Sequence, residues 1–190
     1  MTDTTAAGAA GEVAQVPGRT GEAGAAGEEF LLLDRQICFS LNAASRAFGS
    51  VYRLALKDLG LTYPQYLVML VLWEHGELPV KRIGALVRLD SGTLSPLLKR
   101  LEAAGLVRRE RLASDERSVA VRLTREGAAL RTRALRVPRA IAAATGLRLD
   151  EIEDLRARLG HLTAALDRAA AQGLVADPAA LPTAEPEPSS

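Results

Sequence analysis

The sequence predicts a mainly α-helical protein with one small β-hairpin, and three observations lead to this fold class. Apolar residues make up 48% of the 190 residues but aromatic residues only 4%, so Leu, Val and Ala must form most of the core. Those residues recur at three- and four-residue steps over most of the chain, as in amphipathic helices. One stretch instead alternates with a period of two, which predicts paired strands.

Both ends of the chain differ in composition from its middle. Residues 1–28 consist mainly of Ala, Gly, Thr and Glu, and residues 171–190 end in Pro, Ala, Glu and Ser. Neither segment has enough large apolar side chains to offset the entropy of ordering, so we predict that both are disordered. Residues 29–170 form the predicted folded domain.

The first three helices are marked by their caps and breakers. Asp34 can act as the N-cap of a helix that runs to about Lys57. Pro64 suits the first turn of a second helix, which ends at Gly76, and Pro79 opens a short third helix. Four apolar residues of the third helix are expected to face inward: Val80, Ile83, Leu86 and Val87.

The fourth helix follows a turn at residues 88–90 and ends at Gly105. Two starts remain open. With Asp90 as the N-cap, Pro96 lies inside the helix, whereas Ser95 as the N-cap makes Pro96 the first helical residue. The apolar residues at helical spacing are Leu94, Leu97, Leu98 and Leu101.

A hairpin and two further helices complete the domain. Residues 107–111 and 118–123 read as strands, with residues 113–117 at the tip. Thr124 caps a long helix that kinks or stops near Pro138, and Asp150 caps the last helix. A narrow apolar stripe in the last helix is typical either of a coiled-coil seam or of packing within one chain; it contains Ile152, Leu155, Leu159, Leu162 and Leu166.

Positive charge is concentrated in the middle of the chain. Residues 81–136 contain fourteen Lys and Arg residues against six acidic ones, a net charge of +8, whereas the whole chain carries +1. Residues 1–29 contain five acidic residues and one Arg, and residues 171–190 contain three acidic residues and no basic one. A basic block of this kind is what contacts to phosphate require.

The short helix, tight turn, helix and basic hairpin together predict a winged helix-turn-helix at about residues 78–124. A helix fits the major groove of B-DNA, which is about 12 Å wide. Small hydroxyl side chains at the start of the fourth helix can contact bases or phosphates, and an arginine at the hairpin tip can enter the minor groove. The expected DNA-binding residues are Ser91, Thr93, Ser95, Lys99, Arg100, Arg108, Arg109 and Arg117.

Cys38 is the only cysteine, so an intramolecular disulfide is excluded and a reduced, cytoplasmic protein is expected. No stretch approaches the roughly 20 apolar residues of a membrane span, and the N-terminus lacks the pattern of a secretory signal. His75 and His161 have no neighbours that could complete a metal site, so we expect neither a metal nor another cofactor.

Two segments carry a resemblance to a known family. Residues 115–124 (DERSVAVRLT) resemble the wing signature of the MarR family, and residues 89–102 (LDSGTLSPLLKRLE) resemble its organic hydroperoxide resistance regulators. The likeness runs from about Leu32 to Leu166. It implies a repressor that is a two-fold homodimer through its N- and C-terminal helices, with the recognition helix in the major groove of operator DNA and Arg117 in the minor groove.

Residues 36–41 (QICFSL) and 61–66 (LTYPQY) resemble the same branch. The resemblance implies that Cys38 reacts with peroxide and that Tyr52 and Tyr63 of the partner subunit hold its thiolate. Asn42 stands where many members have a further tyrosine, and its amide can still donate a hydrogen bond. The residues support this independently, because the positive start of a helix favours a thiolate. Tyr52 would lie about 21 Å from Cys38 on one straight helix, so only a second, antiparallel subunit could bring them together.

The resemblance therefore implies a repressor that releases DNA when an organic hydroperoxide oxidises Cys38. With one cysteine, the sulfenic acid would condense with a small cellular thiol, and overoxidation is the irreversible alternative. Three other interpretations remain. The protein could be a MarR-type repressor relieved by a phenolic ligand, with Cys38 inert. It could be a thiol peroxidase, although no resolving cysteine exists, so we expect no enzyme. It could also bind an acidic protein partner through its hairpin.

Overall fold

The computed structural model describes residues 31–112 and 115–173, and of residues 112 and 115–118 it describes the backbone alone. The segments expected to be disordered lie outside the described residues, except for residues 171–173. The chain divides into two units, Met1–Arg46 and Ala47–Ser190, and their boundary falls within helix α1 (Ile37–Ala55).

The described part of the first unit contains a 3₁₀ turn, η2 (Leu33–Arg35), and the first half of α1. Asp34 lies inside this turn, so the prediction that it caps the first helix is wrong. The turn closes first, through a hydrogen bond from the N–H of Gln36 to the carbonyl of Leu33, and α1 begins only afterwards. Cys38 is consequently the second residue of α1, and every side chain from 37 to 46 is exposed.

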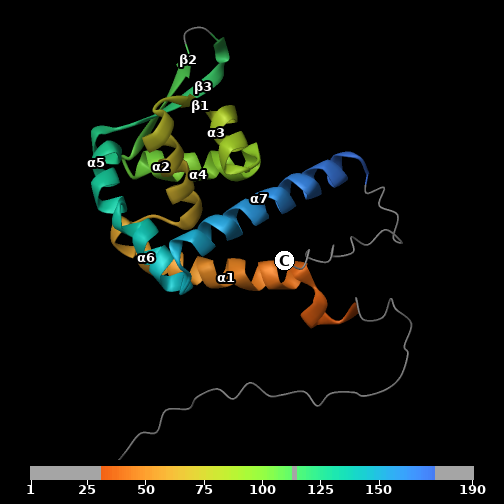
Figure 1. Ribbon diagram of the computed structural model, residues 1–190. Coiled ribbons are helices and arrows are strands. Elements are labelled where there is room, and N and C mark those ends of the chain that lie inside the picture. Colours follow the sequence, from red (N-terminus) through yellow and green to blue (C-terminus); the bar gives the residue numbers. More distant parts are fainter. Residues whose placement is uncertain (1–30, 113–114, 174–190) are drawn as a thin grey trace, which may run out of the picture. The chain divides into compact units, whose positions relative to one another are not determined.

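The second unit contains the other helices and a three-stranded antiparallel sheet of order β1-β3-β2 (Figure 1), which confirms the mainly helical fold with one small sheet. After the second half of α1, its elements are η3 (Lys57–Leu59), α2 (Tyr63–His75), β1 (Leu78–Pro79), α3 (Val80–Val87), α4 (Ser91–Ala103), β2 (Val107–Leu112), β3 (Asp115–Leu123), α5 (Arg125–Ala134), α6 (Arg136–Thr145) and α7 (Leu149–Ala171).

The start of α4 settles the two alternatives that the sequence left open. Asp90 is the N-cap, and its Oδ1 accepts a hydrogen bond of 2.9 Å from the N–H of Thr93. Pro96 therefore lies inside the helix. At the other end, Gly105 has a φ of +71°, and the next residue, Leu106, donates its N–H back to the helix.

The hairpin is longer than predicted. Pairing of β2 with β3 extends to Leu112 and Asp115, so Arg117 lies in strand β3 rather than in the tip loop. The third strand, β1, was not predicted, because its two residues carry no local strand signal and are ordered only by pairing with Val121 and Ala120.

Two helix boundaries also differ from the prediction. The helix after Thr124 is interrupted at Leu135, between α5 and α6, and Pro138 lies in the first turn of α6. Asp150 is not the cap of the last helix. Arg148 occupies that position, and its N–H donates to Oε2 of Glu151 at 2.7 Å.

The core lies in the second unit, where α2 and α4 pack with α3 and the sheet. Tyr66 and Met69 are buried, and half-buried Trp73 donates its indole N–H to the carbonyl of Gly127 at 2.9 Å. In α3, Ile83 is fully buried but Leu86 is 38% exposed, so the inward orientation predicted for Leu86 is wrong. The other residues at the centre include Val68, Leu72, Leu94, Leu98, Leu101, Val107 and Val121.

Candidate nucleic-acid interface and thiol site

The first turn of α4 presents polar groups to solvent. Ser91 and Thr93 are exposed, and Ser95 is half-buried. The hydroxyl of Thr93 donates to Oδ2 of Asp90 at 2.9 Å. The hydrogen bond from the backbone N–H of Thr93, with that from its hydroxyl, lowers the pKa of Asp90. The cap therefore remains ionised and fixes the start of the helix, while Lys99 and Arg100 are exposed further along it.

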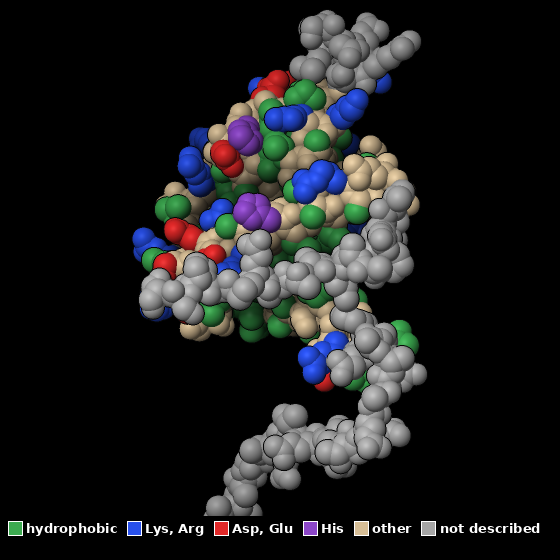
Figure 2. Space-filling view, turned by 45° about the vertical axis from the view of Figure 1, so that its right-hand side comes forward, with side chains coloured by type: hydrophobic (Ala, Val, Ile, Leu, Met, Phe, Trp, Pro, Cys, Tyr) green, Lys and Arg blue, Asp and Glu red, His purple; other side chains and the backbone are tan. Residues whose placement is uncertain are grey.

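A groove of about 480 Å³ lies between α3, α4 and the sheet. It brings Ser91, Ser95 and Arg109 together with Lys81, a residue that the sequence analysis did not single out. Lys81 stands at the start of the basic block and in the first turn of α3, and that position was the available signal. Figure 2 shows one face of the molecule, on which Lys and Arg side chains are scattered among uncharged side chains and some Asp and Glu.

The arginines of the hairpin differ in their surroundings. Arg108 is exposed, whereas Arg109 is half-buried and donates from Nε to Oε2 of Glu102 at 2.8 Å. The hydrogen bond from the Arg109 side chain lowers the pKa of Glu102, and the backbone N–H of Arg109 also donates to that carboxylate. Arg109 thus ties β2 to α4. The side chain of Arg117 lies outside the described residues.

The predicted thiol site is divided between the two units. In the first unit, Cys38 is exposed with its Sγ 3.9 Å from Oε1 of Gln36, and Oδ1 of Asn42 accepts a hydrogen bond of 3.3 Å from Arg46. In the second unit, the structure brings two of the predicted residues together: the ring centroids of Tyr52 and Tyr63 are 4.4 Å apart.

These two tyrosines differ in exposure. Tyr52 is half-buried, and burial, together with the neighbouring Tyr63, raises its pKa. Its phenol therefore keeps its proton at neutral pH and can donate a hydrogen bond. Tyr63 is 41% exposed, so its ring can reach another molecule.

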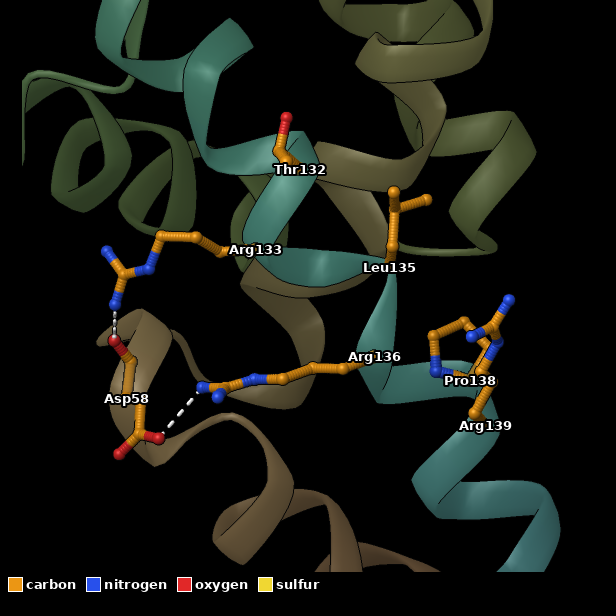
Figure 3. A pocket seen from close by; sticks show the side chains of 7 residues that line it. All are labelled: Asp58, Thr132, Arg133, Leu135, Arg136, Pro138 and Arg139. Carbon is orange, nitrogen blue, oxygen red and sulfur yellow. Dashed lines mark hydrogen bonds and ion pairs between the residues drawn. The ribbon is translucent and has the colours of Figure 1, made fainter.

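A second basic pocket, of about 870 Å³, lies at the junction of α5 and α6 (Figure 3). Arg133 donates to the backbone carbonyl of Asp58, and Arg136 donates to its carboxylate at 2.8 Å. The side chain of Arg139 points away from Asp58 in the same view. The two bonded arginines therefore brace η3 against the α5–α6 junction.

Within the part of the chain that the structure describes, no helix is both long and apolar enough to cross a membrane. The same residues contain no cluster of His, Cys, Asp and Glu that could hold a metal ion.

Several known proteins resemble this chain over about two thirds of its length or more. The family model described as transcriptional regulator SarA/Rot matches residues 50–132. The HTH-type transcriptional regulator TtmR of Methylorubrum extorquens is 51% identical over 71% of this chain and 68% of its own length. The organic hydroperoxide resistance transcriptional regulator of Bacillus subtilis is 46% identical over 67% of this chain and 85% of its own.

Solved structures agree with these sequence relatives. Reduced AbfR bound to DNA superposes with a TM-score of 0.62 and 39% identity, covering 73% of this chain and 96% of that one. AbfR, from Staphylococcus epidermidis, has also been solved in an overoxidised, DNA-bound form and in a disulfide form. The sequence relatives are transcriptional regulators rather than enzymes. The chain therefore belongs to the MarR family of winged helix-turn-helix, DNA-binding transcriptional regulators, on the branch of the organic hydroperoxide resistance regulators.

Proposed function

We propose that the protein is a cytoplasmic, dimeric repressor that binds operator DNA while Cys38 is reduced and releases it when an organic hydroperoxide oxidises Cys38. The observation that carries this proposal is the position of the only thiol, which is exposed in the first turn of α1. Free N–H groups at the start of a helix stabilise an anion, and the thiolate is the form that attacks a peroxide.

The proposed reaction has two steps. The thiolate attacks one peroxide oxygen, the O–O bond breaks and an S–O bond forms, which gives a sulfenic acid and, after protonation, an alcohol. A small cellular thiol then attacks the sulfenic sulfur, and water leaves as the mixed disulfide forms. The second sulfur must come from another molecule, because Cys38 is the only cysteine of the chain.

A homodimer is part of the proposal, because two helices expose apolar side chains that a single chain leaves uncovered. In α1, Ile37 is 64% exposed and Phe39 is 46% exposed, and in α7, Leu166 is 59% exposed. Transfer of such surface from water into an interface is favourable. On one straight helix, Cys38 and Tyr52 lie about 21 Å apart. Tyr52 and Tyr63 would therefore support the thiolate of the partner subunit, with Asn42 beside it.

DNA recognition would use residues about 78–124 of a folded domain at 29–170. Exposed residues of α4 would contact bases and phosphates, and Arg108 and Arg117 would follow the hairpin along the DNA. Arg109 would position the hairpin through Glu102, and Lys81 would add a phosphate contact. The α4 residues are Ser91, Thr93, Ser95, Lys99 and Arg100.

The relatives support a redox response. The Bacillus subtilis relative is named for organic hydroperoxide resistance, and AbfR has been solved reduced, overoxidised and with a disulfide. These states belong to AbfR. They support the proposal that a thiol in this fold can be oxidised.

The test measures fluorescence anisotropy of DNA from the protein's own upstream region, with one equivalent of cumene hydroperoxide and with cysteine as the small thiol. Wild type should release the DNA, and Cys38→Ser should remain bound. Tyr52→Phe and Tyr63→Phe should release it more slowly, whereas Tyr66→Phe, which removes the hydroxyl of a buried tyrosine, is the matched control. Intact mass should show one cysteine added to wild type.

Two results would contradict the proposal. If Cys38→Ser releases DNA as wild type does, or if neither releases it although binding is tight and specific, Cys38 is not the switch. A repressor relieved by a phenolic ligand would then be the better assignment. Steady consumption of hydroperoxide by the wild type with excess thiol would instead indicate a peroxidase.

A further inference from the structure

Arg88 stands at an unusual backbone position. It ends α3 with a φ of +56°, and among the described residues it is the only non-glycine residue with a positive φ. A side chain makes this left-handed conformation costly, and glycine or asparagine would adopt it more easily. An arginine at this position therefore suggests that its side chain has a role that glycine could not fill.

That side chain contacts a helix far away in the sequence. Nη2 of Arg88 donates to both carboxylate oxygens of Asp167, at 2.7 and 2.9 Å. Asp167 lies in the last part of α7, four residues before the helix ends. These hydrogen bonds raise the pKa of Arg88 and lower that of Asp167, so both groups are charged at neutral pH. The pair is open to solvent, with side chains 62% and 54% exposed.

Arg88 is also close in sequence to the start of α4, the helix proposed to bind DNA. It precedes the N-cap Asp90 by two residues, and Ser91 and Thr93 follow in the first turn of α4. A guanidinium group binds phosphate with the same bidentate geometry that it uses for carboxylate. A DNA phosphate beside the first turn of α4 could therefore replace the carboxylate of Asp167.

We propose that Arg88 is a phosphate-binding residue of the DNA interface and that Asp167 is its intramolecular competitor. DNA binding exchanges the carboxylate for a phosphate and frees the end of α7 from the α3–α4 turn. The reduced protein therefore binds DNA less tightly than its basic surface allows. This inference rests on the proposed use of α4 for DNA binding and is independent of the response to peroxide.

The test compares variants of the full-length, reduced protein by anisotropy of the same DNA, without peroxide. Asp167→Asn should lower Kd by about two- to fivefold for each half-site, the range expected when an exposed ion pair no longer competes. This gain in DNA affinity should shrink as the salt concentration increases, because salt screens an exposed ion pair. Arg88→Asn, which suits the left-handed backbone, should weaken binding, and Asp167→Asn should add nothing in that background.

Asp154 supplies the matched control. It lies on the same helix, is 60% exposed and pairs with Arg158 at 2.8 Å. Asp154→Asn thus removes the same charge and breaks a similar ion pair without freeing Arg88, so Kd should not change. If both variants tighten binding equally, the effect is one of net charge and the proposal is overturned. It is overturned as well if Asp167→Asn leaves Kd unchanged.

Lys99→Ala separates this inference from the assignment of α4. If Lys99→Ala weakens DNA binding and Asp167→Asn has no effect, α4 reads DNA and only the competitor is refuted. If Lys99→Ala has no effect, the DNA-binding role of α4 fails and this inference fails with it. Carboxyl NMR gives a direct readout, because the Asp167 signal of wild type should shift on addition of DNA and the Asp154 signal should not.

Discussion

A methyl group added at Gly127 would meet main-chain atoms. The Cβ of an alanine there would lie 2.0 Å from the carbonyl oxygen of Leu106 and 2.9 Å from its carbonyl carbon. No side-chain rotation can relieve a clash with backbone, so α5 must move away from Leu106, the residue just before β2. That movement strains the hydrogen bonds from Thr124 N–H to the Leu106 carbonyl (3.1 Å) and from Trp73 to the Gly127 carbonyl (2.9 Å).

The expected loss of stability follows from these contacts. Overpacking in a filled interior costs about 1–3 kcal/mol. Loss of these two hydrogen bonds costs about 1 kcal/mol each. Alanine regains about 1 kcal/mol over glycine inside a helix. Gly127→Ala should therefore lower the free energy of unfolding by about 2–4 kcal/mol, the sum of those terms.

Urea unfolding followed by circular dichroism measures this loss, at one protein concentration for all variants because a dimer is proposed. Gly160→Ala is the matched control. Gly160 lies inside α7, and apart from its chain neighbours and the backbone of its own helix no atom of the described residues lies within 4 Å of the added Cβ, so alanine should stabilise the protein by up to about 1 kcal/mol. A midpoint for Gly127→Ala at or above that of wild type would refute the reasoning.

Three further predictions concern single polar groups. Asp90→Ala removes the N-cap of α4, which accepts from the N–H of Thr93, and should cost about 1 kcal/mol in urea unfolding and weaken DNA binding. Asp90→Asn should retain most of the stability and of the DNA affinity. Equal losses in the two variants would contradict the role of Asp90 as the cap. Glu102→Gln should cost about 1 kcal/mol at neutral pH, since Arg109 loses its ionic partner. Because the folded-state pKa of Glu102 is lowered, this contribution is present above its unfolded pKa of about 4.3 and is lost as pH falls through the folded value. The stabilities of the two proteins should therefore converge in acid, and a gap that persists there would exclude the ion pair. Burial raises the pKa of both Tyr52 and Tyr66, so an ultraviolet titration should show these two tyrosines ionising above about 10, and Tyr52→Phe should lower the amplitude of that phase.

Elements with a strong local signal were predictable from the sequence. Pro64 and Gly76 located α2, the apolar spacing located α4, and Gly105 ended α4 where predicted. Where two local signals competed, the structure was needed. Asp90 and Pro96 favour different helix starts. The helix begins after Asp90, because the two hydrogen bonds from Thr93 to the Asp90 carboxylate outweigh the helical hydrogen bond that is lost at Pro96, which has no backbone N–H.

Features fixed by distant parts of the chain could not be predicted. Strand β1 exists only through pairing with β3, and the partner of Glu102 becomes clear only when the hairpin folds against α4. The pairing of Arg88 with Asp167 spans 79 positions of the chain and has no local signature. The thiol site remains a proposal that rests on residue types, and its two proposed tyrosines meet only because η3 turns the chain between α1 and α2.

A single exposed cysteine also makes the natural chain ready for site-specific labelling. A nitroxide attached at Cys38 would place one electron spin on each chain without any engineered substitution. Pulsed electron spin resonance would then record a distance between two labels only when two chains associate. The width of the measured distance distribution would report how rigidly the two chains are held. The residue proposed to end DNA binding is thus also a natural labelling site for measuring quaternary structure.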